Sequence, residues 1–180
     1  MTIHPRITST EFDLSDGSTC VVREAVASDL ESIVALLVDD PLGVSRESAD
    51  EMDRYRAAFE DISSDPRNLQ VVVVHGDAVV ATLQLTFIPG LARGGALRAQ
   101  IEAVRVGAQW RSRGLGGALI RWAIDEAERW GSALVQLTSD ASRTDAHRFY
   151  TRLGFVDSHV GYKMTLGTTT WIPWGGRVVL

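Results

Sequence analysis

The spacing of hydrophobic residues changes along the chain, and each spacing predicts one type of element. Apolar residues from Leu30 to Leu37 recur at i, i+3, i+4 and i+7, which predicts a one-faced helix. Continuous β-branched residues over 69–74 predict a central strand that is covered on both faces. Alternating apolar and polar residues over Ala78–Ile88 predict a strand that pairs with it as a hairpin.

The same treatment of the whole chain gives the order β-α-α-β-β-β-α-β-α-β-β. Strands are expected at Thr19–Glu24, 69–74, Ala78–Ile88, Arg98–Val106, 133–138, 155–160 and 162–166, and helices at 30–37, between Ser45 and Ile62, at 115–130 and at 145–153. Residues 1–18 are expected to form an N-terminal arm, 19–166 one domain, and 167–180 a C-terminal tail without assignable periodicity. The pattern indicates an α/β fold.

Two of these elements have faces that can be assigned. Period two places Glu102, Val104 and Val106 on one face of their strand. The helix at 115–130 is expected to turn Leu115, Leu119, Trp122 and Trp130 toward a core and to leave Arg121, Asp125 and Glu128 in water.

Composition limits the classes of protein that fit. The 180 residues carry a formal net charge of −5, which argues against a nucleic-acid binder. No apolar run is long enough to cross a membrane, and the N-terminus lacks a hydrophobic signal region, so a cytoplasmic protein is expected. The single cysteine, Cys20, lies in an expected strand and is interpreted as a small core residue.

A glycine-rich loop precedes the helix at 115–130. It contains Arg111, Ser112, Arg113, Gly114, Leu115, Gly116 and Gly117. Glycines allow the backbone N–H groups to approach an anion, and the helix N-terminus adds its positive dipole end. Both arginines add forked cationic donors. The loop predicts a pyrophosphate site, although a plain tight turn into a helix remains the alternative.

The spacing Arg111-x-x-Gly114-x-Gly116, after a strand and before a helix, resembles the acetyl-CoA pyrophosphate loop of the GCN5-related N-acetyltransferases (GNAT). A second stretch, from Ala146 through Phe149 and Tyr150 to Gly154-Phe155, resembles another signature of this family. Within the family, residues 145–150 and Ser158-His159 are most similar to aminoalkylphosphonate N-acetyltransferases. The family often has Asn where this chain has Arg143.

The resemblance implies a mixed, mostly antiparallel central sheet with a splayed parallel strand pair and helices on both faces. It implies acetyl-CoA as co-substrate, held by the loop, by Arg143 and Phe149, and by the backbones of Val104 and Val106. Transfer of the acetyl group to a primary amine of a small molecule, by direct attack in a ternary complex, is the implied reaction. A protein or peptide N-acetyltransferase and a non-catalytic acyl-CoA-binding module are the alternatives, and a homodimer fits family habit.

Two residues are candidates for proton transfer. Glu102 resembles the family's general base; alternatively it is a surface carboxylate paired with Arg98 or Arg105, and Asp140 is then the second candidate. Tyr150 resembles the family's general acid, because a tyrosine is neutral at pH 7 and can protonate a departing thiolate. Its alternative role is that of a packed aromatic ring whose hydroxyl only orients the sulfur.

Two further pairs of residues are interpreted from the sequence alone. His147 and His159 lack paired ligand spacing, so they are interpreted as structural or hydrogen-bonding residues, and no metal is expected. Asp39 and Asp40 follow the first helix. They either attract a cationic amine or form a solvated helix end.

Overall fold

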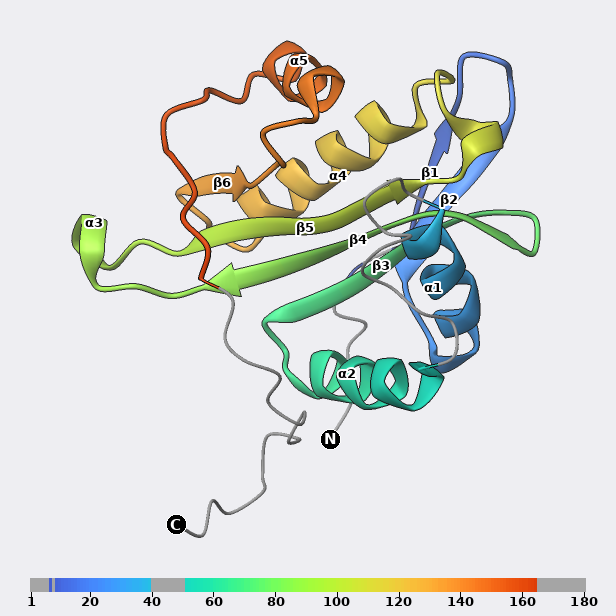
Figure 1. The fold of residues 1–180 in the computed structure, drawn as a ribbon, viewed down its shortest axis with the longest axis horizontal. Coiled ribbons are helices and arrows are strands. Elements are labelled where there is room, and N and C mark those ends of the chain that lie inside the picture. Colours follow the sequence, from blue (N-terminus) through green and yellow to red (C-terminus); the bar gives the residue numbers. More distant parts are fainter. Residues whose placement is uncertain (1–6, 8, 40–50, 165–180) are drawn as a thin grey trace, which may run out of the picture. The chain divides into compact units, whose positions relative to one another are not determined.

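Six strands form one sheet in which they lie side by side in chain order. The strands are β1 (Thr10–Asp13), β2 (Thr19–Glu24), β3 (Asn68–His75), β4 (Ala78–Ile88), β5 (Arg98–Val106) and β6 (Leu134–Leu137) (Figure 1). The structure is a computed structural model that describes residues 7, 9–39 and 51–164. The chain separates into two compact units, Met1–Ser139 and Asp140–Leu180, and each is treated by itself.

The sheet is mixed, as expected. β1 to β5 pair antiparallel, with Val71 opposite Leu83 and Leu85 opposite Ile101. β6 runs parallel to β5 and pairs only with its first half, Arg98–Ile101. β5 continues to Val106 with no strand on that side among the described residues.

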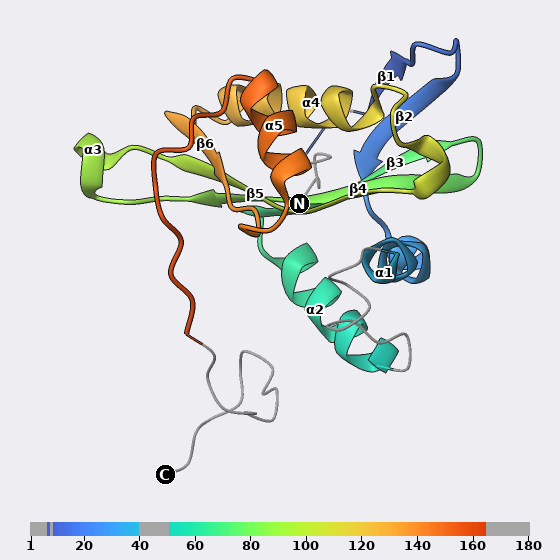
Figure 2. The same cartoon turned by 45° about the horizontal axis from the view of Figure 1, so that its top comes forward.

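Helices cover both faces of the sheet. A short 3-10 turn, Ala27–Asp29, leads into α1 (Leu30–Val38), and α2 (Met52–Ser64) follows it on the same face. α4 (Leu115–Arg129) lies on the opposite face, between β5 and β6 in the chain (Figure 2). The remaining short turns are α3 (Ala92–Gly95), in the loop after β4, and a 3-10 turn at Ala108–Trp110.

The core confirms the hydrophobic pattern. β3 is central, and its residues from Leu69 to Val73 are buried on both faces. On α4, Leu115, Leu119 and Trp122 are buried, as the helical spacing predicts. Trp130 stacks on Phe87 of β4 with ring centroids 4.1 Å apart. The predicted solvent-facing residues Arg121, Asp125 and Glu128 are exposed. Cys20 is fully buried, and burial raises the pKa of its thiol, which agrees with a core role.

Asp29 joins β2 to the start of α1. Its carboxylate accepts hydrogen bonds from the Arg23 guanidinium at 2.6 and 2.9 Å and from the Val26 N–H at 2.8 Å. Burial raises the pKa of Asp29, but the hydrogen bonds from Arg23 and Val26 and the charge of Arg23 outweigh it, so the pKa lies below its ordinary value. The carboxylate therefore stabilises the turn before α1. It does not cap α1 itself, because no side-chain hydrogen bond caps that helix.

Two expectations about the ends of the chain were wrong. Residues Thr10–Asp13, expected within a loose arm, form β1 and pair with β2. Residues 155–160, expected as a strand, carry no strand, nor do 161–164, and Val156 and Val160 are exposed. A strand requires backbone pairing with a partner, and residues 155–164 form no such pairing with the described residues. Residues 165–166 and the tail at 167–180 lie outside the described residues, as do Asp40 and Ser45.

The second unit contains one helix, α5 (Thr144–Arg152). Its apolar residues are half-buried along one side, as the sequence predicts: Ala146, Phe149, Tyr150 and the following Leu153. Gly154, with φ of +95°, ends the helix in the left-handed region that favours glycine.

Candidate functional site

The loop between β5 and α4 has an unusual backbone. Ser112 has φ of +63° and Gly114, at the N-cap of α4, has φ of +87°. Arg111 before them is extended, and left-handed residues in such a loop can turn backbone N–H groups toward an anion. No side chain caps α4, so the N–H groups of its first turn lack an acceptor within the helix. The loop and helix end can therefore hold an anionic group.

Both loop arginines are engaged with carboxylates. Arg111 donates to the Asp39 carboxylate at 3.1 Å, to the Asp39 carbonyl at 3.2 Å and to the Val106 carbonyl at 2.9 Å. It thus joins the loop to the C-terminal end of α1. The sequence allows Asp39 to attract a cationic amine. In the structure its carboxylate is in this ion pair, and Asp39 does not line the pocket described below.

Arg113 connects the loop to the β1–β2 turn. It pairs with Asp16 at 2.9 Å and lies over the Trp110 ring, 5.3 Å from its centroid. Hydrogen bonds from the Ser18 hydroxyl and N–H, together with Arg113, hold the pKa of Asp16 below its ordinary value. The sequence predicted free cationic donors at both positions; in the structure, an anionic ligand would have to compete with a carboxylate at each of them.

A β-bulge in β5 changes the faces predicted for its residues. Glu102 pairs with Gln84 and Arg105 pairs with Thr82, so two residues of β5 stand opposite Leu83. Ala103, inside this bulge, has φ of +52°. Glu102 and Arg105 therefore share the face covered by α1 and α2, while Val106, opposite Ala81, belongs to the other face. The prediction that Glu102 and Val106 share a face was wrong, because period two does not survive an inserted residue.

The carboxylate of Glu102 is exposed at this bulge. Within the described ranges it forms no ion pair, so the alternative of a surface pair with Arg98 or Arg105 is not realised there. The carbonyls of Val104 and Val106 accept hydrogen bonds from the Arg105 and Arg111 side chains at 2.9 Å each. Each carbonyl retains a second lone pair.

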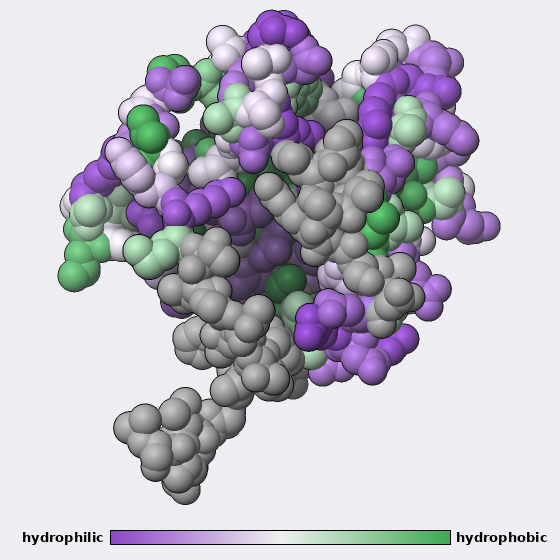
Figure 3. Space-filling model, viewed as in Figure 1, coloured by the Kyte–Doolittle hydropathy of each residue, from purple (hydrophilic) through white to green (hydrophobic). Residues whose placement is uncertain are grey.

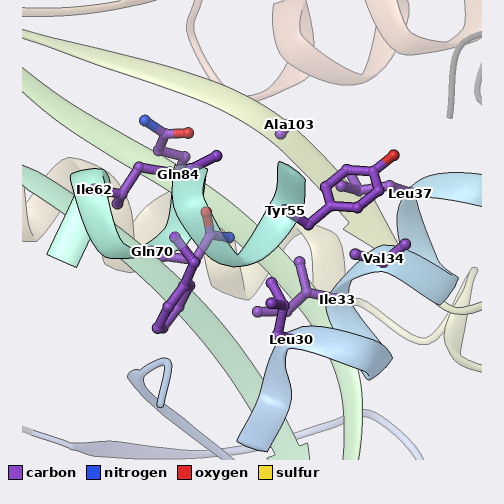
Figure 4. Close-up of a pocket in the computed structure, with 11 residues that line it drawn as sticks. Leu30, Ile33, Val34, Leu37, Tyr55, Ile62, Gln70, Gln84 and Ala103 are labelled. Carbon is purple, nitrogen blue, oxygen red and sulfur yellow. The ribbon is translucent and has the colours of Figure 1, made fainter. Parts of the chain in front are cut away.

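A pocket of about 130 Å³ opens between α1, α2 and the sheet (Figure 4). Its wall is apolar except for two glutamines and a tyrosine. The lining residues are Leu30, Ile33, Val34 and Leu37 of α1, Tyr55, Ala58, Phe59 and Ile62 of α2, and Gln70, Gln84 and Ala103 of the sheet. Because Gln84 is the ladder partner of Glu102 and Ala103 follows Glu102, the pocket adjoins the exposed carboxylate.

The amide of Gln70 has a fixed orientation in the sheet. Its Nε2 donates to Thr82 Oγ1 at 2.8 Å and to the Leu83 carbonyl at 3.2 Å. Thr82 in turn donates to the Val71 carbonyl at 2.7 Å. Carbonyl oxygens only accept, so the network assigns the nitrogen to the strand side and leaves Oε1 as an acceptor toward the pocket.

The second unit holds the other residues that the sequence singled out. Tyr150 has Phe149 and Phe155 around it in edge-on ring contacts at 5.2 and 5.9 Å. Arg143 stands at the N-cap of α5, and its carbonyl accepts the His147 N–H. Asp140, the second candidate base, accepts the Ser142 hydroxyl and N–H at 2.7 and 3.0 Å, so its carboxylate closes a turn. His147 donates its Nε2–H to the Asp140 carbonyl at 2.9 Å.

Sequence reasoning missed the pocket and its amides. Gln70 interrupts a run of buried apolar residues, and such a buried polar side chain was the available signal. Gln84 belongs to an ordinary polar alternation and gave none. The part of the chain that the structure describes has no group of three or more His, Cys, Asp or Glu arranged to hold a metal ion. Among the same residues, no helix combines the length and apolarity that crossing a bilayer requires.

Comparison with known proteins agrees with this geometry. The profile of the acetyltransferase (GNAT) family matches residues 30–155. The aminoalkylphosphonate N-acetyltransferase of Salmonella typhimurium is 27% identical over 147 residues, which are 82% of this chain and 92% of that protein. A transcriptional regulator from Bacillus halodurans has a solved structure with a TM-score of 0.79 and 43% identity, covering 82% of this chain and 99% of that one. A putative acetyltransferase from Agrobacterium tumefaciens has a TM-score of 0.69 and 27% identity, covering 81% and 99%.

The chain belongs to the GNAT acetyltransferase family. It is an acyltransferase, an acetyl-CoA-dependent N-acetyltransferase, and its mixed sheet with one parallel strand pair is the fold of its structural neighbours.

Proposed function

We propose that the protein transfers the acetyl group of acetyl-CoA to the primary amine of a small molecule, by direct attack in a ternary complex. The amine nitrogen attacks the thioester carbonyl, the C–S bond breaks, and CoA leaves as a thiol. One proton leaves the amine and one reaches the sulfur. The chain must therefore hold CoA, take a proton from the amine and supply one to the thiolate.

One observation carries the proposal. The uncapped N-terminus of α4 is joined by a short loop to a strand, β5, that is bulged at Ala103 and has lost its parallel neighbour beyond Ile101. A pyrophosphate on the loop and first turn of α4 would lead the rest of CoA toward this open edge. We place the acetyl carbonyl on a backbone N–H of residues 102–106 and the pantetheine on the backbones of Val104 and Val106.

Glu102 is the proposed general base. An alkylammonium has a reference pKa of about 10.4, so presenting the free amine at pH 7 costs roughly 4–5 kcal/mol. A carboxylate that takes the proton, directly or through one water, removes part of this cost. Glu102 is exposed, carries no ion pair in the described chain, and adjoins the apolar pocket between α1, α2 and the sheet.

Tyr150 is the proposed general acid, with Phe149 and Arg143 as further CoA contacts. A phenol of reference pKa near 10 remains protonated at pH 7 and can donate to a thiolate of reference pKa near 8.5. The half-buried ring, held between two phenylalanines, suits a hydroxyl whose direction is fixed.

The substitution Glu102→Gln tests the proposal. We expect kcat/KM at pH 7 to fall by about 10²–10⁴, the usual contribution of a general base, and the residual activity to rise with pH as the amine deprotonates without help. Glu128→Gln, at an exposed carboxylate on α4, is the matched control and should behave as wild type. An unaltered pH–rate profile in Glu102→Gln would transfer the role to Asp140 or to ordered water.

A panel of amines separates this function from its alternatives. Release of CoA thiol with small amines, measured beside a set of peptides, identifies the acceptor class. Turnover with peptides alone would make the protein a peptide N-acetyltransferase. Tight CoA binding without turnover on any acceptor would make it an acyl-CoA-binding module.

A further inference from the structure

The pocket between α1, α2 and the sheet allows the acceptor to be described further. We infer that it binds the non-reacting end of the acceptor amine, and that this end is apolar, uncharged and about the size of a benzene ring. This inference rests on the proposed function, because it assumes that the amine reacts beside Glu102. Four features of the pocket lead to it.

The first feature is an apolar face of α2 that the described residues cover incompletely. α2 carries apolar residues on one side and charged residues on the other, and its outer surface is hydrophilic (Figure 3). None of its residues is buried, although Tyr55, Phe59 and Ile62 face the sheet. Leu37 and Phe59 pack against the core around Ile33 and also border the hollow, which gives it the apolar wall that is typical of small-molecule sites.

The second feature is size. A protein cavity of roughly 150 Å³ lined by aliphatic and aromatic side chains holds one benzene molecule. The present pocket, of about 130 Å³, is close to that volume. It fits a short branched alkyl chain or a single ring, and it does not fit a peptide side chain together with its backbone.

The third feature is charge. None of the described residues that line the pocket is Arg, Lys, His, Asp or Glu. Arg105, on the same face of the sheet, donates to the Val104 carbonyl at 2.9 Å. The loop arginines Arg111 and Arg113 are paired with Asp39 and Asp16. A carboxylate or a second ammonium group placed against this wall would lose its hydration without gaining a partner, which is strongly unfavourable.

The fourth feature gives the acceptor a direction. Gln84 and Ala103 form the end of the pocket that adjoins Glu102, and the Gln84 amide lies above the Gln70 amide in Figure 4. An amine at this end can donate an N–H to a carboxamide oxygen while Glu102 takes its proton. The carbon skeleton then points along the walls formed by α1 and α2, toward residues such as Val34 and Phe59.

The test compares benzylamine with its para-carboxylate derivative, which has the same amine and ring but an anionic end. We expect kcat/KM for benzylamine to exceed that of the carboxylate by about 100-fold or more. Equal values, or a preference for the anionic amine, would overturn the inference while leaving the N-acetyltransferase function intact.

Two alanine-to-leucine substitutions on α2, one inside the pocket and one outside it, form a matched pair of variants. Ala58 lines the pocket and Ala57 does not, although both are half-buried on α2. Ala58→Leu should lower kcat/KM for benzylamine roughly 10-fold or more, through overpacking, and should spare methylamine. Ala57→Leu adds the same atoms outside the pocket and should change neither. If Ala58→Leu acts no differently from Ala57→Leu, the pocket does not bind the acceptor.

Direct binding keeps the inference testable if no amine is acetylated. Calorimetry of benzylamine with the CoA-loaded protein should give saturable binding that Ala58→Leu abolishes and Ala57→Leu preserves. Absence of turnover on every amine would then refute the proposed function alone. Absence of binding as well would overturn the assignment of the pocket.

Discussion

At the scale of single residues, charged side chains around the loop have structural partners of their own. Arg111 and Arg113 hold α1 and the β1–β2 turn against the loop, and Arg23 holds Asp29 before α1. Glu102 differs from them, since no ion pair in the described chain satisfies it. A carboxylate that lies beside an apolar pocket and forms no ion pair with a described residue can accept a proton from a bound amine. Glu102 is therefore the proposed general base.

Tyr150 tests the role of a single hydroxyl. Tyr150→Phe keeps the ring between Phe149 and Phe155, so the midpoint of thermal unfolding should change little. Turnover should fall by about 10²–10⁴ while CoA binding persists. The defect should shrink with an acyl donor whose thiol has a lower pKa, because that thiolate leaves without a proton. Near-normal turnover in a folded Tyr150→Phe protein would make the hydroxyl structural.

Asp29 gives a prediction about stability and pH. Its pKa is lowered in the folded chain, so its contribution is complete above the unfolded pKa of about 3.9 and is lost as pH falls through the folded value. Asp29→Asn should lower the free energy of unfolding at pH 7 by about 2–3 kcal/mol, and the difference should shrink below about pH 4.

Denaturant titrations at several pH values measure this difference. Asp53→Asn is the control. Asp53, like Asp29, forms an ion pair with an arginine, here Arg56, but its side chain is 97% exposed. An exposed pair contributes at most about 1 kcal/mol, so this variant should stay near wild type. Equal losses in the two variants would contradict the role assigned to Asp29.

At the scale of elements, strand β5 and helix α4 meet at the loop, and each contributes an irregular end. β5 is bulged at Ala103 and loses its parallel neighbour after Ile101, while α4 begins without a side-chain cap. A side-chain cap on α4, or a strand beside the second half of β5, would satisfy these backbone groups. The irregular ends leave N–H groups that a ligand can use.

Gly116, in the first turn of α4, tests the anion site at this scale. In Gly116→Val a β-branched side chain would stand where a phosphate must approach the N–H groups. The dissociation constant of CoA should rise by about 10-fold or more, as charge-assisted hydrogen bonds are lost. Calorimetry measures it, with Ala118→Val in the same helix as the control. Unchanged affinity in a folded Gly116→Val protein would remove the pyrophosphate assignment.

At the scale of the whole molecule, the first unit combines the two proposed sites on one sheet. The loop that leads into α4 lies at one end of β5, and the pocket lies under α1 and α2 beside Glu102. Separate places for CoA and acceptor suit direct transfer between two bound substrates. A covalent acetyl-enzyme would require an accessible nucleophile, and the one cysteine, Cys20, is fully buried.

Steady-state kinetics test this arrangement. Initial rates at varied acetyl-CoA and amine should give intersecting reciprocal plots rather than the parallel lines of a covalent route. Because burial raises the pKa of Cys20, its thiol should resist alkylation in the native protein and react after unfolding. Cys20→Ala should keep kcat within a factor of about two. Parallel plots for the wild-type protein, together with loss of turnover in Cys20→Ala, would refute direct transfer.

The sequence by itself determined the elements whose burial follows a simple period. β3 and β4, the two faces of α4 and the burial of Cys20 were predicted because apolar spacing reports directly which side of an element meets the core. These properties are local, and neighbours in the chain are enough to define them.

Only the tertiary structure decided the rest. The bulge at Ala103 placed Glu102 and Val106 on opposite faces, and Ala103 is not a residue type that announces a left-handed backbone. Residues 155–160 have the composition of a strand without forming one, since pairing depends on a partner far away in the chain. The pairing of Arg111 with Asp39 and the pocket beside Gln84 arise from residues 72 positions apart or on separate elements. Long-range contacts decide such features, and no single stretch of sequence contains them.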